Sequence, residues 1–305
     1  MVSYPHIPPS AFLQLIGNGF RDRLVLRRLG EDEDSCLHAV FLATVCGFSN
    51  INYLFVLPGT MGTKDTIIDD ETLRSFSRMA YGHEIWLDEI EKDGDEVSVY
   101  GLYGHKMLPD KPMPTDYANV LLYDDNGRVE NPEREIVNKP SGWRFTFNDA
   151  GADVYTMYVD SNSTWVTNEE GWHRGSKRNY DNVTYSGAFN MVAKRIVSKD
   201  AAVPGNVMHA ALEIMPERAV LEQGKTATVR VLYEEKPMKG IKCTIYNRDW
   251  QDLLMTKTDE EGKVSFVADK PGMYAIIAKY TDDSKAVSDE FDETSFTTTL
   301  TIDCE

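Results

Sequence analysis

Apolar and β-branched residues recur in short runs from about Met79 onward, and turn-forming residues separate these runs. This pattern is typical of antiparallel sheets, in which strands alternate with tight turns. No stretch with helical periodicity lies between the runs, which argues against a parallel α/β sheet. We therefore expect strands at 84–88, 97–103, 119–123, 143–147, 154–160, 188–197, 211–215, 226–233, 242–246, 264–268, 273–280 and 295–302.

The strand pattern is interrupted where Pro204 and Gly205 separate two groups of runs. The predicted fold class is all-β, with two immunoglobulin-like antiparallel β-sandwiches at 79–206 and 207–305. The second group resembles small immunoglobulin-like modules, and turn residues at 259–262 and 270–272 lie between its strands. Such modules usually serve as packing units, and we expect the same of 207–305.

The first 78 residues lack this rhythm of strands. We consider three interpretations of 1–78: a small helical appendage, a degraded leader, or upstream sequence added by a misplaced start codon, and we favour the first and the third equally. An acidic run at 31–34 separates the arginines from the apolar run at 37–48, whereas the basic start of a secretory signal leads into its apolar core. That apolar run is also shorter than the ~20 residues that cross a bilayer. The sequence therefore predicts neither a signal peptide nor a membrane span.

Composition narrows the classes of function. The chain carries 32 Lys and Arg against 49 Asp and Glu, which gives a formal net charge of -17. Such a charge repels a nucleic-acid backbone and is compatible with binding cations. The 4 cysteines are too few for a disulfide scaffold and contain no CxxC pair. We expect Cys243 and Cys304 to be free thiols.

A predicted β-hairpin brings two of the 6 histidines together. Asp93-Gly94 is a strong signal for a two-residue turn, and a hairpin closed there pairs His83 with Gly104, next to His105. We expect the Cβ atoms of the two histidines to lie about 5–7 Å apart, so both imidazoles can reach one metal ion. Neutral imidazole binds nickel, cobalt, copper and zinc.

Two further histidines complete the set of candidate metal ligands. His209 lies at the junction between the predicted sandwiches, and His173 lies in a predicted loop. The neighbouring Arg174 disfavours a second positive charge at His173. The sequence thus predicts a divalent transition-metal site that is built on His83 and His105, with His209 and His173 as additional ligands.

An enzyme is not predicted, because the chain contains no nucleophile elbow, HExxH motif, P-loop or Gly-x-Gly-x-x-Gly loop. Trp86, Trp143, Trp165 and Trp172 could form an aromatic platform for carbohydrate, although tryptophans in sandwiches more often pack in the core. The acidic stretch 282–293 has no turn-making glycine, so we favour a solvated loop over a calcium site there.

Several short motifs occur in a defined order along the chain: Gly82-His83-Glu84-Ile85-Trp86-Leu87, Gly104-His105, 167–175 with Lys177, Ala193-Lys194-Arg195-Ile196-Val197, Leu212-Glu213-Ile214-Met215-Pro216, Lys236-Pro237, Thr258-Asp259, Gly262 and Pro271-Gly272 with Tyr274. In this order, over about residues 80–302, they resemble the uncharacterised family labelled as a nickel-uptake substrate-specific region. Members are often encoded near nickel or cobalt transporters of the energy-coupling-factor type and are commonly exported.

The resemblance implies a binding protein for nickel or cobalt that assists uptake or delivery at such a transporter. It also implies a periplasmic or extracellular location, while the absence of a recognisable signal in this sequence leaves the cytoplasm open. The expected partners are a divalent metal ion and the transporter, with no nucleic acid and no direct membrane span. The alternatives are a structural or adhesive cell-envelope protein built of immunoglobulin-like modules, or a carbohydrate-binding module; an enzyme acting on carbohydrate ranks last.

Overall fold

The computed structural model describes residues 83–105, 107–109, 118–129 and 131–305, together with the backbone of four short strands nearer the N-terminus. The chain divides into two units, Met1–Gly82 and His83–Glu305. In the first unit, β1 (Leu24–Leu26) pairs with β4 (Thr66–Ile68), and β2 (Ala39–Ala43) pairs with β3 (Tyr53–Leu57). The described pieces of the segment 1–78 are therefore strands.

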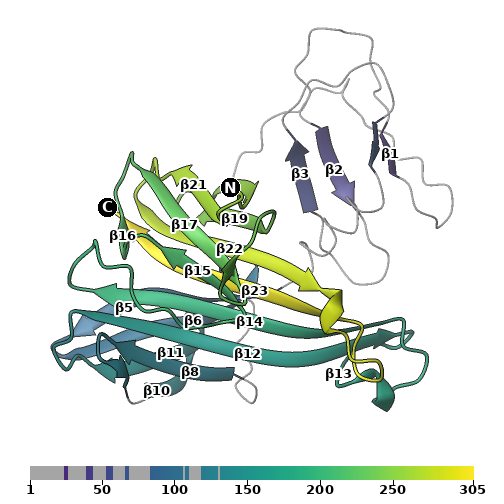
Figure 1. Cartoon of the computed structure of the whole chain (residues 1–305), viewed down its shortest axis with the longest axis horizontal. Helices are drawn as coiled ribbons and strands as arrows, with labels where there is room; N and C mark the ends of the chain where they lie inside the picture. The colour runs from purple at the N-terminus through teal and green to yellow at the C-terminus, as the bar shows by residue number, and fades with distance from the viewer. Residues whose placement is uncertain are drawn as a thin grey trace, which may run out of the picture. The chain divides into compact units, whose positions relative to one another are not determined.

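The second unit is almost entirely β-structure (Figure 1). Its strands are β5 (Glu84–Asp93), β6 (Glu96–His105), β7 (Leu108–Pro109), β8 (Ala118–Asp124), β9 (Gly127–Arg128), β10 (Glu133–Asn138), β11 (Ser141–Asn148), β12 (Val154–Asn168), β13 (Gly171–Arg174), β14 (Tyr185–Ser198), β15 (Leu212–Pro216), β16 (Val220–Leu221), β17 (Thr226–Tyr233), β18 (Lys236–Pro237), β19 (Lys242–Asn247), β20 (Asp252–Lys257), β21 (Lys263–Val267), β22 (Gly272–Asp282) and β23 (Glu293–Cys304). Short 3₁₀ turns occupy η1 (Lys177–Asn179) and η2 (Asp283–Lys285). The all-β fold class is confirmed. No helix in the described part of the chain is long and apolar enough to cross a membrane.

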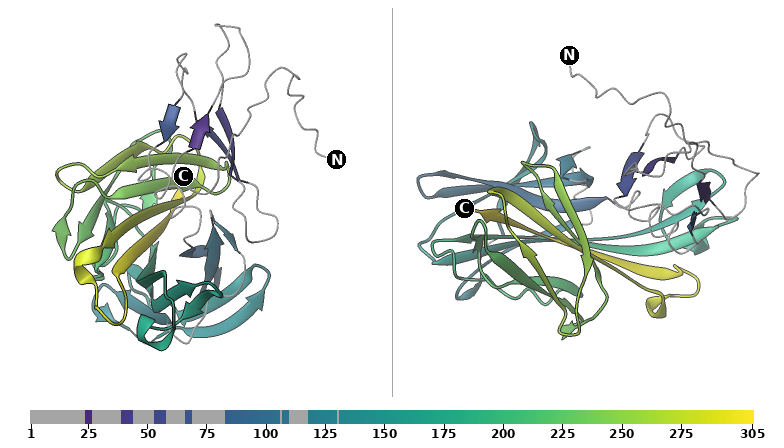
Figure 2. Two further views of the ribbon diagram at one scale, coloured as in Figure 1. Left: turned by 90° about the vertical axis from the view of Figure 1, so that its right-hand side faces the viewer. Right: turned by 90° about the horizontal axis from the view of Figure 1, so that it is seen from above.

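Three layers make up this unit. The middle sheet has the strand order β20-β19-β22-β23-β14-β12-β8-β9. The first covering sheet has the order β10-β11-β6-β5, and the second covering sheet is formed by β15, β17, β18 and β21. The right-hand view in Figure 2 shows the blue strands of the first covering sheet on one side of the long central strands and the green strands of the second on the other.

Side-chain alternation along the middle sheet fills two cores, one on each face. On β14, Ala193 and Val197 pack with the first covering sheet, whereas Ile196 packs with the second. On β22, Ala275 and Ile277 lie on one face, with Trp86 of β5, while Ile276 lies on the other. A strand buried on both faces must be apolar at consecutive positions, which explains the continuous apolar run that predicted the strand at 273–280.

A parallel strand pair joins the two sequence regions on either side of Pro204. Strand β23 pairs with β14 in parallel, from Gly187↔Glu293 to Arg195↔Thr301, and pairs with β22 in antiparallel fashion on its other side. The antiparallel sandwiches predicted from the sequence therefore include one parallel ladder at their junction. Strands from 79–206 and from 207–305 share a single sheet as a result.

Candidate metal centre

The β5–β6 hairpin positions the two central histidines. Its turn is Gly94-Asp95, because Asp93 pairs with Glu96, and Gly94 takes a φ of 61° that suits glycine. A register shift between Leu87 and Ile90 then leaves Glu84 opposite Gly104. The predicted register, with His83 opposite Gly104, was wrong by one residue. The shift aligns the histidines more closely, because His83 directly precedes Glu84 and His105 directly follows Gly104.

The imidazoles of His83 and His105 are in contact. Their ring centroids are 4.2 Å apart with an interplanar angle of 36°. Tyr103, which lies on the same face of β6 as His105, stacks on His83 at 4.5 Å with an angle of 4°. Both imidazoles are partly buried. The expected proximity of the two histidines is confirmed, and the packed tyrosine restricts the rotation of His83.

Glu84, the residue next to His83, forms an ion pair with the middle sheet. Its side chain is buried, and a carboxylate oxygen lies 3.5 Å from Nζ of Lys279 on β22. Because successive residues of a strand point to opposite faces, Glu84 shares the face of Trp86, which packs on β22, whereas His83 lies on the side of Ile85 and Leu87, which pack on β12 and β14. This ion pair anchors the start of β5, from which His83 projects.

The other two predicted ligands make different contacts. A ring nitrogen of His173, on β13, lies 3.1 Å from Oδ1 of Asn168, and the ring stacks on Tyr180 at 5.0 Å. His209 has a φ of 56°, and its Nδ1 lies 2.7 Å from a carboxylate oxygen of Glu235. Among the described residues, no three His, Cys, Asp or Glu side chains are grouped so that they could hold a metal ion. The structure thus brings His83 and His105 together, without His173 or His209.

The hairpin and both sandwich layers fall within a recognised family. Residues 80–282 match the family model described as Domain of unknown function (DUF4198). The chain belongs to this family. No curated protein matches the chain. The matched DUF4198 region ends at the last residue of β22, whereas β23, which follows it, lies between β22 and β14 in the middle sheet.

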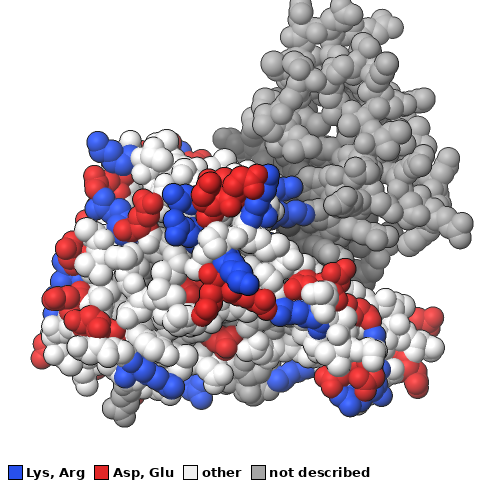
Figure 3. Space-filling model, in the orientation of Figure 1, with Lys and Arg blue, Asp and Glu red and all other residues white. Residues whose placement is uncertain are grey.

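Three acidic residues of the stretch 282–293, which begins at the end of the matched DUF4198 region, are ion-paired. Lys177 bonds to Asp292, and Arg178 bonds to Glu290 and lies 3.6 Å from Asp289. The bond from Lys177 holds the pKa of Asp292 below its usual range, with help from Ser186. Figure 3 shows acidic and basic side chains close together at the end of the molecule that carries β13. These carboxylates fasten the 282–293 connection to η1.

The two described cysteines of this DUF4198 protein and some of its tryptophans are packed in the fold. Cys243 and Cys304 are free and buried, and burial raises the pKa of Cys243 to about 12, so it is a poor metal ligand at neutral pH. Trp86 is buried between sheets and donates its indole N–H to Asp88 at 2.8 Å. Trp143 packs against the core of the first covering sheet, whereas Trp172 is exposed. The described tryptophans therefore lie in different environments, with Trp86 in the core as favoured.

Sequence reasoning missed Tyr103 as part of the histidine cluster. The signal was available, because Tyr103 and His105 are two residues apart on a predicted strand and so share a face. This spacing could not show on which face of the hairpin His83 would lie, because that depends on the register shift at 87–90.

Proposed function

We propose that this protein binds a divalent transition metal, nickel or cobalt, through His83 and His105 and assists its uptake or delivery at a membrane transporter. The observation that supports this proposal is the contact between the two imidazoles, whose centroids are 4.2 Å apart at the open end of one hairpin. The surrounding chain is strongly acidic, with a formal net charge of -17, and so attracts cations.

Two imidazoles can ligate one ion after a modest rotation. A metal–nitrogen distance of about 2.0–2.1 Å requires one nitrogen of each ring to point at the ion, so the stacked rings must turn partly edge-on. The remaining coordination positions would be filled by water or by groups of an acceptor protein. Incomplete coordination by the protein suits an ion that is captured and then handed on.

The choice of metal has separate support. Imidazole is a good ligand for nickel, cobalt, copper and zinc alike. Nickel or cobalt is preferred on the resemblance of the ordered motifs, from Gly82-His83 to Pro271-Gly272, to the nickel-uptake family. The description of the matched DUF4198 family names no function, so the metal must be established by titration.

Calorimetric titration of the full chain with nickel tests the proposal. We expect about one site per chain, with the affinity falling steeply below about pH 6 because protonated imidazole cannot ligate. His83→Ala and His105→Ala should each weaken binding at least tenfold, and the double variant should lose little more, because the two rings act as one unit. His173→Ala is the matched control and should bind nickel like the unaltered protein; His209→Ala should have at most a similar effect to the hairpin variants.

Two results would overturn the metal site. One is undiminished nickel binding by the His83→Ala/His105→Ala double variant, and the other is no binding by the unaltered protein near neutral pH. Parallel titrations with cobalt, copper and zinc rank the metals. If zinc binds more tightly than nickel or cobalt, the metal site stands, but the proposal that it carries nickel or cobalt is contradicted.

A structural or adhesive role is the second candidate, and one feature favours it. Strand β20 forms an edge of the middle sheet, and three of its residues, Leu253, Leu254 and Met255, are each about half exposed. Nearby Trp250 is 55% exposed. Exposed apolar residues on an edge strand suit contacts with other proteins. If the unaltered protein does not bind nickel in the titration, the structural or adhesive role becomes the favoured function.

A further inference from the structure

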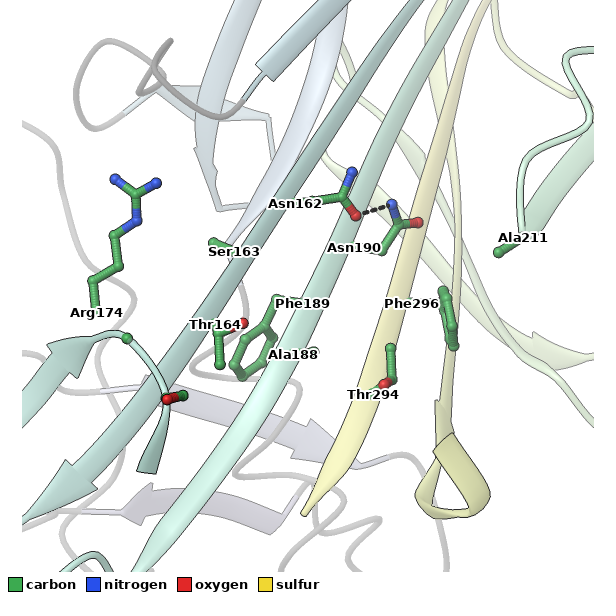
Figure 4. A pocket seen from close by; sticks show the side chains of 12 residues that line it. Asn162, Ser163, Thr164, Arg174, Ala188, Phe189, Asn190, Ala211, Thr294 and Phe296 are labelled. Carbon is green, nitrogen blue, oxygen red and sulfur yellow. Dashed lines mark hydrogen bonds between the residues drawn. The ribbon is translucent and has the colours of Figure 1, made fainter. Parts of the chain in front are cut away.

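A cavity of about 550 Å³ opens beside the long strands β12 and β14 (Figure 4). It lies where β12 has a gap on one edge: β8 pairs with β12 only as far as Ser161, and β13 pairs only from Trp165. Between them, Gly175 N–H bonds to the Thr164 carbonyl at 2.8 Å. The volume is within the range of small-molecule binding sites.

Two directly opposed asparagines line this cavity. Asn162 of β12 pairs with Asn190 of β14, and the Asn190 amide nitrogen donates to Asn162 Oδ1 at 2.8 Å. Both amide nitrogens also donate to Oδ1 of Asp160, at 2.8 Å from Asn190 and 3.0 Å from Asn162. The carboxylate therefore fixes the orientation of both amides, because an acceptor oxygen must face their nitrogens.

This arrangement leaves hydrogen-bonding capacity directed at the cavity. Both hydrogens of the Asn190 amide are used, so its Oδ1 remains as an acceptor, and Figure 4 shows this oxygen on the side away from Asn162. The Asn162 amide keeps one further hydrogen to donate. The two amides that line the cavity thus keep one acceptor and one donor, each in a fixed orientation.

The residues themselves are unusual for their position. Asn and Asp are depleted in strands, yet three of them occupy neighbouring places in the two longest strands of the molecule. A single cross-strand bond would suffice to link β12 to β14, which already share a ladder from Val154↔Ser198 to Thr167↔Tyr185. Stability therefore does not account for the full network.

We propose that this cavity binds a small neutral saccharide through Asn162 and Asn190. A sugar carries neighbouring hydroxyl groups, each of which both donates and accepts, and these match the paired amides. Thr164 and Thr294 add hydroxyls on the same face of the sheet as the two asparagines. Phe296, which pairs with Asn190 and also lines the cavity, offers an apolar ring to the C–H face of a sugar. Arg174 is the charged residue that lines the cavity, whereas the chain as a whole is strongly acidic, with a formal net charge of -17, which disfavours an anionic ligand.

Saturation-transfer NMR on the full chain, with glucose, galactose, mannose, maltose, lactose and glucuronate as probes, tests this site. We expect transfer to at least one neutral sugar, and less or none to glucuronate. In a titration with that sugar, Asn190→Ala should raise the Kd at least tenfold, because it removes the acceptor and breaks the network. Asn138→Ala, on the exposed edge strand β10, is the matched control and should leave the Kd unchanged.

Ala188→Trp provides a second variant that fills the cavity while Asp160, Asn162 and Asn190 stay unaltered, and it should abolish binding. Both variants should keep the affinity for nickel, which separates this site from the histidine pair. The proposal is overturned if no neutral sugar shows transfer, if glucuronate alone binds, or if folded Asn190→Ala and Ala188→Trp bind the sugar like the unaltered protein.

Discussion

The two covering sheets pack on the same middle sheet in different ways. The core beneath the second covering sheet is built almost wholly from 211–304, with Val154 and Ile196 as its contributions from the earlier region. The first covering sheet instead packs on strands from both regions. Its residues Ile85 and Leu87 meet β12 and β14, while its neighbour Trp86 meets β19 and β22.

This difference shows that a clear boundary in sequence need not be a boundary in folding. Trp86 is 1% exposed and is buried against Met273, Ala275 and Ile277, which lie almost two hundred positions further along the chain. Without those residues, the face of β5 that carries Trp86 would be open to water. The earlier region therefore depends on the later one for part of its core.

Truncation of the chain tests this dependence. Of the changes considered, it should reduce the stability of the fold the most. A chain ending at Asn206 loses β23, the partner of β14, and exposes Trp86 and one edge of β14. We expect it to lack a cooperative thermal transition and to aggregate, because unpaired sheet edges and uncovered apolar surface favour association. Circular dichroism melting and size-exclusion chromatography, with the full chain as control, provide the measurement. A cooperative, monomeric fragment would show that the earlier region folds alone.

The buried ion pair between the layers should give the next largest effect. Lys194 of β14 lies 2.7 Å from Glu213 of β15, and both side chains are almost fully buried. Removing one charge leaves the other without its partner, which typically costs about 3–5 kcal/mol. We expect Lys194→Met and Glu213→Gln each to lower the free energy of unfolding by that amount in urea titrations.

The double variant distinguishes pairing from mere packing. Lys194→Met with Glu213→Gln removes both charges and retains an acceptor for the Met208 N–H, which now bonds to Glu213 at 2.8 Å. It should recover most of the lost stability. As a surface control, Lys199→Met removes an exposed pair with Asp149 and should change stability by less than about 1 kcal/mol. Additive losses in the double variant would contradict the pairing argument.

The smallest expected change in stability is at Asp292, which links the end of the long strands to η1. Its pKa is lowered in the folded state by Lys177 and Ser186. A depressed carboxyl pKa stabilises the fold above the unfolded-state value of about 3.9, and this contribution is lost as the pH falls through the folded-state value. Asp292→Asn should therefore be less stable than the unaltered protein at pH 7, by about 1 kcal/mol or less.

The pH dependence separates the charge of Asp292 from its hydrogen bonds. Urea unfolding between pH 2 and pH 7 should show the difference between Asp292→Asn and the unaltered protein shrinking toward acid pH, where both side chains are neutral. A difference that stays constant over this range would place the effect in the hydrogen bond from Ser186 rather than in the charge.

Strands with alternating apolar residues were predictable from the sequence. Strands whose formation depends on pairing with neighbouring strands were not. Each predicted run lies within a strand or extends at most one residue beyond it, because the inward positions are apolar and the ends carry turn residues. Strand β10 was missed because Glu133–Asn138 is an edge strand whose residues are mostly exposed and polar. Strand β13 is only 4 residues long and depends on pairing with the end of β12. The parallel pairing of β14 and β23 was not predictable, because no tight turn connects parallel strands.

The candidate metal centre was predictable only in part. A turn signal within one hairpin sufficed to bring His83 and His105 together, because the two segments are close in sequence. The contacts of His173 and His209 depend instead on local partners, Asn168 and Glu235, that no short-range pattern links to the hairpin. The amide network of Asn162 and Asn190 depends on the register of two long strands, which requires the whole sheet.

The position of β23 also sets the order of events during biosynthesis. This strand follows all the other described strands along the chain, yet it occupies the interior of the middle sheet, between β22 and β14. Until the ribosome has released it, β14 and β22 both present unsatisfied edges, and such distant pairings form slowly. Assembly of the middle sheet can therefore be completed only once β23 has left the ribosome, and a chaperone that shields strand edges during this interval would raise the yield.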